Sequence, residues 1–261
     1  MPRFSANLSM LYPELPFMDR FAAAAADGFE AVEYVGAYDQ DPAALRQLLN
    51  QHELVQALFN LPAGDWSAGE RGIACHPDRV KEFRAGVIKA IHFAQATGCV
   101  QVNCLAGIAP AGHDRAALER VLIDNLAFAA PRLAESGIKL LLEPINTRDI
   151  PGFLVNSTDD FERIAAAVGS DNLCLQYDFY HMQVVQGDLL PTFARLQQRI
   201  AHVQVADNPG RNEPGTGEIN YSNIFAALDA AGYSGWVGAE YKPKHATSAG
   251  LGWFAPWRGR A

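Results

Sequence analysis

Four oxygen-bearing side chains each close a short apolar run in the second half of the chain. They are Glu143, Asp178, Gln204 and Glu240, and successive members are 35, 26 and 36 residues apart. Each gap is about the length of one strand followed by one helix, so four consecutive units would each bring one side chain to the C-terminal end of a strand. Hard oxygen ligands around one point suit Mg²⁺ or Mn²⁺. The pattern therefore predicts a divalent-metal site formed by these four residues.

The two glutamates of this set are the natural pair for acid–base chemistry. Glu143 and Glu240 would approach a small substrate from different strands, while Asp178 and Gln204 complete the coordination of the metal. A bound metal polarises a carbonyl and a neighbouring hydroxyl, and two carboxylates can take a proton from one carbon and return it to the next. This combination predicts aldose–ketose isomerisation by proton transfer through an enediolate.

Further polar side chains near the four residues are candidates for substrate binding. His181 follows Asp178 by three residues and is expected to stand beside the metal and hydrogen-bond a substrate oxygen. Arg211 lies in a Gly- and Pro-rich segment and offers a planar fork for a substrate carboxylate. Lys242 is a second candidate for that carboxylate, and Arg71 is a third. The alternative for each is an ordinary loop residue that packs or is solvated.

Eight short apolar or alternating segments are separated by helical patterns, and this order predicts one (β/α)₈ barrel. Side chains two apart on a strand share a face, so His202 is expected on the same inward face as Gln204, as a satisfied interior group rather than a ligand. The expected strands are residues 4–8, 31–35, 55–61, 100–105, 139–145, 173–179, 201–206 and 236–241.

Turn and cap signals divide the chain into these units, and we expect a single domain over residues 1–261. Asp41-Pro42, Ser157 and Asn220 mark helix starts, whereas Gly28, Gly98, Gly137 and Gly232 mark helix ends.

Residues 60–77 form a connection that is longer than usual, and we expect an ordered cover over the third strand's end on the catalytic face. The aromatic segment 251–257 is expected to pack either on the barrel's own helices or on a second subunit of a homo-oligomer.

Composition excludes several classes of protein. The formal net charge is −8 and the basic residues are scattered, which argues against nucleic-acid binding. Apolar runs are too short for a membrane span, and the N-terminus lacks the apolar core of a secretory signal, so we expect a cytoplasmic protein. Four cysteines without CxxC spacing indicate free thiols rather than a disulfide framework.

Long sequence runs carry a resemblance to a known family. They include residues 3–10, 60–66, 69–75, 142–146, 176–182, 204–209, 213–221 and 236–243, and together they extend over nearly the whole chain. On these runs the chain resembles the hydroxypyruvate isomerase family of the xylose-isomerase-like barrels. The resemblance implies a (β/α)₈ fold and the interconversion of hydroxypyruvate with tartronate semialdehyde, with Glu143 and Glu240 as paired proton donor and acceptor. The wider superfamily usually has His where Gln204 stands, so a neutral amide there is expected to weaken or alter metal binding.

Three alternatives are weighed against this interpretation. Related isomerases act on four-carbon 2-oxo-tetronates, and one additional hydroxymethyl group cannot be distinguished from the sequence. The apurinic endonucleases of the same superfamily need more His ligands and a basic surface, which this chain lacks. A barrel that only binds a sugar acid would leave the opposed carboxylates unexplained. The sequence therefore predicts an isomerase of a small hydroxy-oxo acid.

Overall fold

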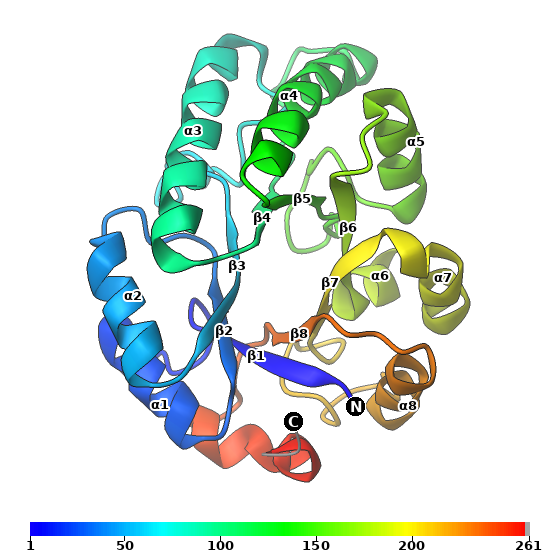
Figure 1. The fold of residues 1–261 in the computed structure, drawn as a ribbon. Coiled ribbons are helices and arrows are strands. Elements are labelled where there is room, and N and C mark those ends of the chain that lie inside the picture. The colour runs from blue at the N-terminus through cyan, green and yellow to red at the C-terminus, as the bar shows by residue number, and fades with distance from the viewer. Residues whose placement is uncertain (259–261) are drawn as a thin grey trace.

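A computed structural model describes residues 1–258, and within them eight parallel strands close into one barrel (Figure 1). The strands follow one another around the barrel in sequence order, and the last pairs with the first. The predicted (β/α)₈ fold is therefore confirmed. The strands are β1 (Arg3–Asn7), β2 (Ala31–Tyr34), β3 (Val55–Asn60), β4 (Gln101–Cys104), β5 (Lys139–Leu142), β6 (Leu173–Asp178), β7 (Ile200–Val205) and β8 (Trp236–Ala239).

Helices surround the barrel on its outside (Figure 1). The α-helices are α1 (Arg20–Ala26), α2 (Pro42–Gln51), α3 (Val80–Thr97), α4 (Arg115–Glu135), α5 (Thr158–Val168), α6 (Phe179–Val185), α7 (Leu189–Leu196) and α8 (Tyr221–Ala230). Short 3₁₀ helices are η1 (Phe17–Asp19), η2 (Pro77–Arg79), η3 (Gln197–Arg199), η4 (Thr247–Trp253) and η5 (Ala255–Trp257). Among residues 1–258, no helix combines the length and the apolar character that crossing a bilayer requires.

The helix boundaries follow from local side-chain chemistry. Asp41, Ser157 and Asn220 each accept a hydrogen bond from a backbone N–H in the first turn of α2, α5 and α8, as the sequence predicts. Gly98 ends α3 in the left-handed conformation, which glycine adopts without steric cost. These caps fix where each helix begins or ends relative to the strand that it covers.

The strands end earlier than the alternation of the sequence predicts. Each predicted strand extends one to three residues too far at its C-terminal end, most clearly after β5. The chain leaves the barrel there and its backbone groups find partners in the loops: the N–H of Ile145, for example, donates to Val155 at 3.0 Å. Glu143 and Glu240 consequently lie one residue beyond their strands, whereas Asp178 and Gln204 lie within theirs.

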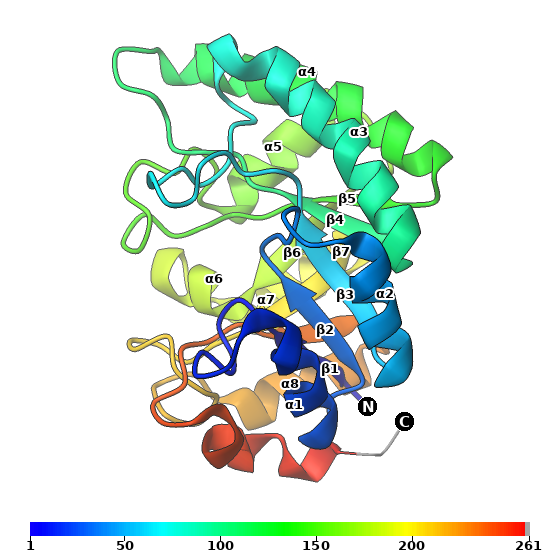
Figure 2. The same ribbon diagram turned by 90° about the vertical axis from the view of Figure 1, so that its left-hand side faces the viewer.

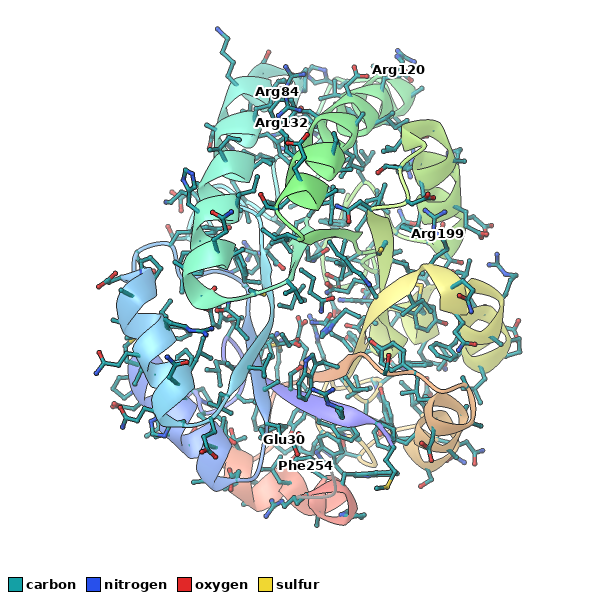
Figure 3. The ribbon with its side chains drawn as sticks, viewed as in Figure 1. Glu30, Arg84, Arg120, Arg132, Arg199 and Phe254 are labelled. Carbon is teal, nitrogen blue, oxygen red and sulfur yellow. The ribbon has the colours of Figure 1, made fainter. Side chains whose placement is uncertain are left out.

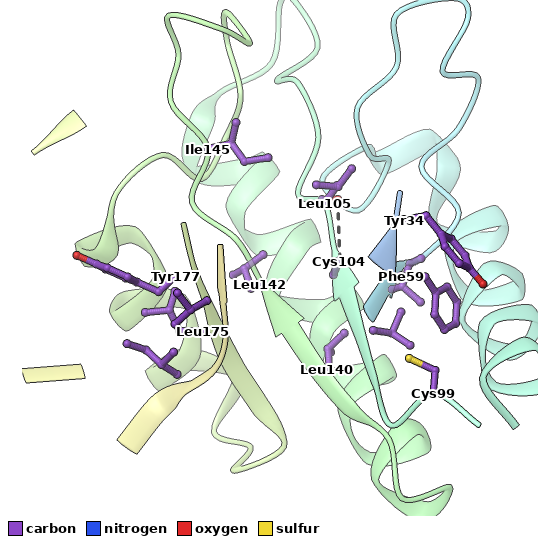
Figure 4. Packing of buried hydrophobic residues seen from close by; sticks show 14 of the residues in the cluster. Tyr34, Phe59, Cys99, Cys104, Leu105, Leu140, Leu142, Ile145, Leu175 and Tyr177 are labelled. Atoms are coloured by element: carbon purple, nitrogen blue, oxygen red, sulfur yellow. Dashed lines mark hydrogen bonds between the residues drawn. The ribbon is translucent and has the colours of Figure 1, made fainter. Parts of the chain in front are cut away.

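Apolar side chains fill the layer between the barrel and the helices. Leu140 and Leu142 on β5 belong to this buried layer, and Figure 4 shows part of it from Phe59 past Leu142 to Tyr177. The C-terminal segment closes the layer at one end: Phe254 stacks on Phe29 with ring centroids 4.4 Å apart and lies near β1 (Figure 3). The aromatic tail therefore packs on this chain's own barrel.

The interior of the barrel is polar instead. Glu33 on β2 accepts a hydrogen bond from Nε2 of His202 on β7 at 2.8 Å, and these two strands are not neighbours, so the bond crosses the interior. Ser5 and Gln204 also donate to Glu33 from β1 and β7. The interior thus holds a buried carboxylate, and the surrounding strands provide its donors.

We expect Gly238→Ala to lower the free energy of unfolding by about 1–3 kcal/mol, because the added methyl would overlap with Oε1 of Glu33. Gly252→Ala is a matched control, since a methyl group there meets no atom within 4 Å, and it should change stability by less than about 0.5 kcal/mol. Denaturant unfolding measures both. Equal stability of the two variants would contradict the close approach of Glu33 to β8.

Candidate active site

A pocket of about 950 Å³ opens at the C-terminal ends of the strands. The loops that follow the strands gather on the left of Figure 2, away from the two marked chain ends. Of the residues singled out from the sequence, seven line this pocket: Arg71, Glu143, His181, Gln204, Arg211, Glu240 and Lys242. Asp178, the eighth, lies directly beside them in contact with His181. The fold therefore brings the predicted residues to one region.

Glu143, Asp178 and His181 form the tightest group in this region. Nε2 of His181 is 3.8 Å from Oε1 of Glu143 and 3.6 Å from Oδ2 of Asp178, and all three side chains are buried. Asp178 also caps α6, because its Oδ1 accepts from the backbone N–H of Tyr180 at 2.7 Å. Its Oδ2 has no hydrogen-bond partner within residues 1–258. One carboxylate oxygen is thus held by the helix and the other is left for a ligand.

The imidazole of His181 is held between two neighbours. Oδ1 of Asn146 accepts from the backbone N–H of Asp149 at 2.8 Å, which turns its Nδ2 toward the imidazole. That Nδ2 lies 2.6 Å from Nδ1 of His181 and donates to it. Nε2 of His181 lies 3.4 Å from Nη2 of Arg211 and faces the carboxylates of Glu143 and Asp178. The imidazole is thus fixed with its Nε2 toward the pocket.

Glu240 is held by Arg211. Nη2 of Arg211 donates to Oε1 of Glu240 at 2.8 Å, and another guanidinium nitrogen lies 3.9 Å from Asp149. The backbone of Arg211 is left-handed, with φ of 53°, a conformation that a non-glycine residue adopts only where the surroundings enforce it. Asp207 organises this loop by accepting from the backbone N–H groups of Gly215, Gly217 and Ile219. The guanidinium is thereby aimed inward at the carboxylates.

The pKa values in the site are shifted by burial and by the crowding of like charges. Burial raises the pKa of Glu143 well above its usual value, and repulsion by Glu240 and Asp178 adds to this. Burial raises the pKa of Asp178 to about 6 and that of Glu240 to about 8, although Arg211 opposes both shifts. Burial, reinforced by Arg211, lowers the pKa of His181 well below its usual value. The carboxylates therefore favour a nearby cation, and His181 stays neutral.

Gln204 sits deeper than the glutamates. Its Nε2 donates to Oε1 of Glu33 at 2.7 Å, and its Oε1 accepts from Nε2 of Gln176 at 2.7 Å. His202, on the same face of β7, is bonded to Glu33 and Gln101 in the barrel interior. Gln204 therefore joins the polar interior to the pocket.

The two remaining predicted residues lie on the pocket wall. Arg71 stacks on Trp66 with its guanidinium carbon 3.9 Å from the ring centroid, and it donates to the backbone oxygens of Trp66 and Glu70. The loop that carries both is closely packed, because a side chain at Gly72 would overlap with the backbone of Leu105. Lys242 follows Glu240 in the loop after β8 and lines the pocket.

Sequence reasoning missed the side chains that support the site. Asn103 on β4 donates to Oε2 of Glu143 at 3.0 Å, Asn146 orients His181, and Glu33 anchors Gln204. Strand alternation offers the one available signal, since Asn103 and Glu33 are polar residues inside short, otherwise buried strands. It identifies an inward-facing polar group but not its partner.

The residues present fit a hard divalent cation. Glu143 and Asp178 offer carboxylate oxygens within reach of a common point, and Oδ2 of Asp178 is buried without a hydrogen-bond partner among the described residues. A buried carboxylate oxygen of this kind is costly unless a proton or a cation compensates it.

Comparison with known proteins agrees with this geometry. The model of the family described as xylose isomerase-like TIM barrel matches residues 21–257. The hydroxypyruvate isomerase of Escherichia coli strain K12 is 50% identical over 258 residues, which are 99% of this chain and 100% of that protein. The 2-oxo-tetronate isomerase of Cupriavidus necator is 49% identical over 260 residues, with all of both chains covered.

One solved structure is also close. A crystal structure described as AP endonuclease, family 2, from Brucella melitensis superimposes with a TM-score of 0.96 at 44% identity, covering 99% of this chain and 100% of that one. The barrel and its loops therefore follow an arrangement already observed by crystallography.

We expect this protein to bind one Mn²⁺ per chain and Asp178→Asn to weaken that binding at least about tenfold, because the substitution removes a buried charge at the proposed ligand position. Asp149→Asn is the matched control: Asp149 lines the same pocket but lies outside the Glu143–Asp178–His181 group, so its loss should change the affinity by less than about threefold. Calorimetric titration with Mn²⁺ measures both. Equal losses of Mn²⁺ affinity in the two variants would indicate attraction by the overall negative charge of the pocket rather than binding at a defined site.

Proposed function

This chain belongs to the xylose isomerase-like TIM barrel family, and we propose that it interconverts hydroxypyruvate and 2-hydroxy-3-oxopropanoate, that is, tartronate semialdehyde. The protein is an isomerase: relatives named hydroxypyruvate isomerase and 2-oxo-tetronate isomerase are about half identical to it over their full lengths. The observation that carries the reaction is the pair of glutamates, Glu143 and Glu240, which face one pocket from the ends of β5 and β8.

These glutamates suit a proton transfer between adjacent carbons. One carboxylate removes a proton from C3 of hydroxypyruvate, which leaves an enediolate, and a carboxylic acid delivers a proton to C2. The proton of the C3 hydroxyl passes to the C2 oxygen, so that C3 becomes the aldehyde and C2 carries the hydroxyl. Before a cation binds, burial raises the pKa values of both Glu143 and Glu240, which suits groups that take up and release a proton. A matched acid and base are what this isomerisation requires.

We assign a divalent cation, Mg²⁺ or Mn²⁺, to Glu143, Asp178, Gln204 and Glu240. When bound, such a cation polarises the substrate carbonyl and stabilises negative charge on the enediolate oxygens. His181 donates its Nε2–H to a substrate oxygen, an orientation that its hydrogen bond with Asn146 supports. Arg211 would turn from Glu240 toward the substrate as the cation takes over the charge of that glutamate.

The substrate carboxylate needs a local cation in this acidic protein. Arg211 is the first candidate, because its guanidinium is at the pocket and its buried Nε has no partner within the described chain. Lys242 and Arg71 stand on the pocket wall as further candidates. Arg211 has the geometry for a bidentate contact, which a lysine lacks.

A four-carbon 2-oxo-tetronate is the second candidate substrate. A relative with 49% identity carries the corresponding name, and a pocket of about 950 Å³ has room for one additional hydroxymethyl group. Phosphodiester cleavage is not favoured, because a net charge of −8 opposes binding of a nucleic-acid backbone. Initial rates with both acids, at equal concentration, decide between the two isomerase substrates.

We expect the wild-type protein to turn over hydroxypyruvate and Glu143→Gln or Glu240→Gln to lose about 10²- to 10⁴-fold in kcat while substrate still binds, since each substitution removes a proton-transfer group. Asn156→Asp, outside the pocket lining, serves as a control for a change between amide and acid. Initial rates of aldehyde formation measure the loss.

Isomerisation in D₂O tests the same step by another route. A proton held on a glutamate can exchange with solvent, whereas a hydride that migrates directly from carbon to carbon cannot. Carbon-bound deuterium in the product supports transfer through the enediolate. Product free of deuterium, together with near-normal kcat in both Gln variants, would rule out this mechanism.

We expect Arg211→Ala to lower kcat/KM by roughly 10²-fold, because it removes the proposed bidentate contact with the substrate carboxylate. Lys242→Ala should have a smaller effect. Arg148→Ala is the control, since Arg148 bonds Tyr180 and Asn208 and is not among the pocket-lining residues. If Arg211→Ala and Lys242→Ala both stay within about twofold of the wild type, another group such as Arg71 holds the carboxylate.

A further inference from the structure

Glu33 lies in the barrel interior at the floor of the pocket, which it helps to line, and is surrounded by donors. Its Oε2 accepts from Oγ of Ser5 at 2.6 Å and from Nε2 of His202 at 2.8 Å. Its Oε1 accepts from Nε2 of Gln204 at 2.7 Å and from Nδ2 of Asn7 at 3.3 Å. The side chain is fully buried and comes from β2, while the donors come from β1 and β7. Every contact that Glu33 makes is therefore one in which it accepts.

The direction of these bonds is fixed by the second partners of the donors. Nδ1 of His202 faces Nε2 of Gln101 at 3.2 Å, so the imidazole carries its proton on Nε2, the atom that meets Glu33. Oδ1 of Asn7 accepts from the backbone N–H of Ser9 at 3.0 Å, so Nδ2 is the end that faces Glu33. Neither group has an acceptor left to offer, and only the hydroxyl of Ser5, which meets Oε2, could accept from Glu33. Oε1, the atom that faces Asn7 and Gln204, is therefore an acceptor.

This has a direct consequence for Gln204. An amide can present either its oxygen or its NH₂ to a neighbour, and the two ends have nearly the same shape. Because Oε1 of Glu33 is an acceptor, the NH₂ of Gln204 faces it, and the carbonyl oxygen of Gln204 faces Gln176. That oxygen accepts one bond, from Gln176 at 2.7 Å, and keeps a second lone pair. A cation needs this oxygen and is repelled by an NH₂ group.

We propose that Glu33 is a positioning residue, which holds the amide of Gln204 so that its carbonyl oxygen is presented to the cation site. The proposal rests on the proposed function in one respect, namely that Gln204 contributes to cation binding. Glu33 acts through Gln204 in this proposal, since its own two oxygens are occupied by four donors. Partners of metal ligands act in this way in other metalloproteins, where their loss commonly weakens binding 10- to 100-fold.

The test is a double-mutant cycle read out by Mn²⁺ affinity. We expect Glu33→Gln to weaken Mn²⁺ binding by about 10- to 100-fold, since a neutral amide at position 33 allows Gln204 to turn its NH₂ toward the cation. In a Gln204→Ala background, Glu33→Gln should cost no more than about twofold further, because the group that it orients has gone. Calorimetry or the EPR signal of free Mn²⁺ gives each affinity.

Ser5→Ala is the matched control. It removes a donor to the other oxygen of Glu33 and leaves the bond to Gln204 in place, so Mn²⁺ affinity should stay within about threefold of wild type even if the melting temperature falls. A role of Glu33 in stability alone would lower the melting temperature in Ser5→Ala and Glu33→Gln and leave Mn²⁺ affinity unchanged in both.

A second variant keeps the proposal testable if Glu33→Gln does not fold. Gln204→Glu adds a carboxylate to the site, and charge alone would tighten Mn²⁺ binding. The positioning proposal predicts no gain in affinity instead, because a side chain that donates to Glu33 from this position must be protonated and then offers the cation a neutral carbonyl oxygen, as Gln204 does. Tighter binding in Gln204→Glu would overturn it.

The remaining outcomes separate this inference from the proposed function. Wild-type protein that binds no Mn²⁺ would defeat both the cation assignment and the positioning role. Wild-type protein that binds Mn²⁺, with independent losses in Glu33→Gln and Gln204→Ala, would leave the cation site standing and overturn the positioning role alone.

Discussion

The burial of several carboxylates within one barrel is the constraint on which the rest of this structure depends. Each ionised carboxylate taken out of water costs several kcal/mol unless a donor or a cation compensates it. Glu33 is compensated by donors from β1 and β7, whereas Glu240 relies on the guanidinium of Arg211. Glu143 and Asp178 receive fewer bonds, and burial raises the pKa values of both carboxyl groups. The negative charge that donors do not compensate is concentrated where the proposed chemistry needs a cation.

Orientation in this site is set by atoms outside it. A side-chain amide or an imidazole has two similar ends, and the second partner of each group decides which end faces the pocket. Asn146 gives the imidazole of His181 a defined orientation, and Glu33 gives the amide of Gln204 a defined direction. The contacts that hold these two supporting residues in place do not involve the substrate. The site is therefore ordered before any ligand arrives.

The fold and the rim of the pocket could be predicted from the sequence because both depend on local regularities. Alternation reveals strands, and the polar residue that closes each strand marks the catalytic end, as with Glu143 and Glu240. The pairing of Arg211 with Glu240 could not be predicted, because it depends on how a loop with a left-handed residue folds back. Nor could the partners of Glu33, which lie up to 171 residues away along the chain and meet it only inside the closed barrel.

The contrast between an apolar outer layer and a polar interior bears on how such an enzyme can be engineered. Barrel interiors are commonly filled by branched apolar side chains, and substituting more of them is a usual route to heat resistance. Here the same change would delete hydrogen bonds that orient the site. Thermostabilising libraries should therefore target the layer between strands and helices, for example around Leu140 and Phe254, while selection for altered substrate range is best confined to the loops. Thermal stability and substrate specificity can therefore be selected in separate rounds of laboratory evolution.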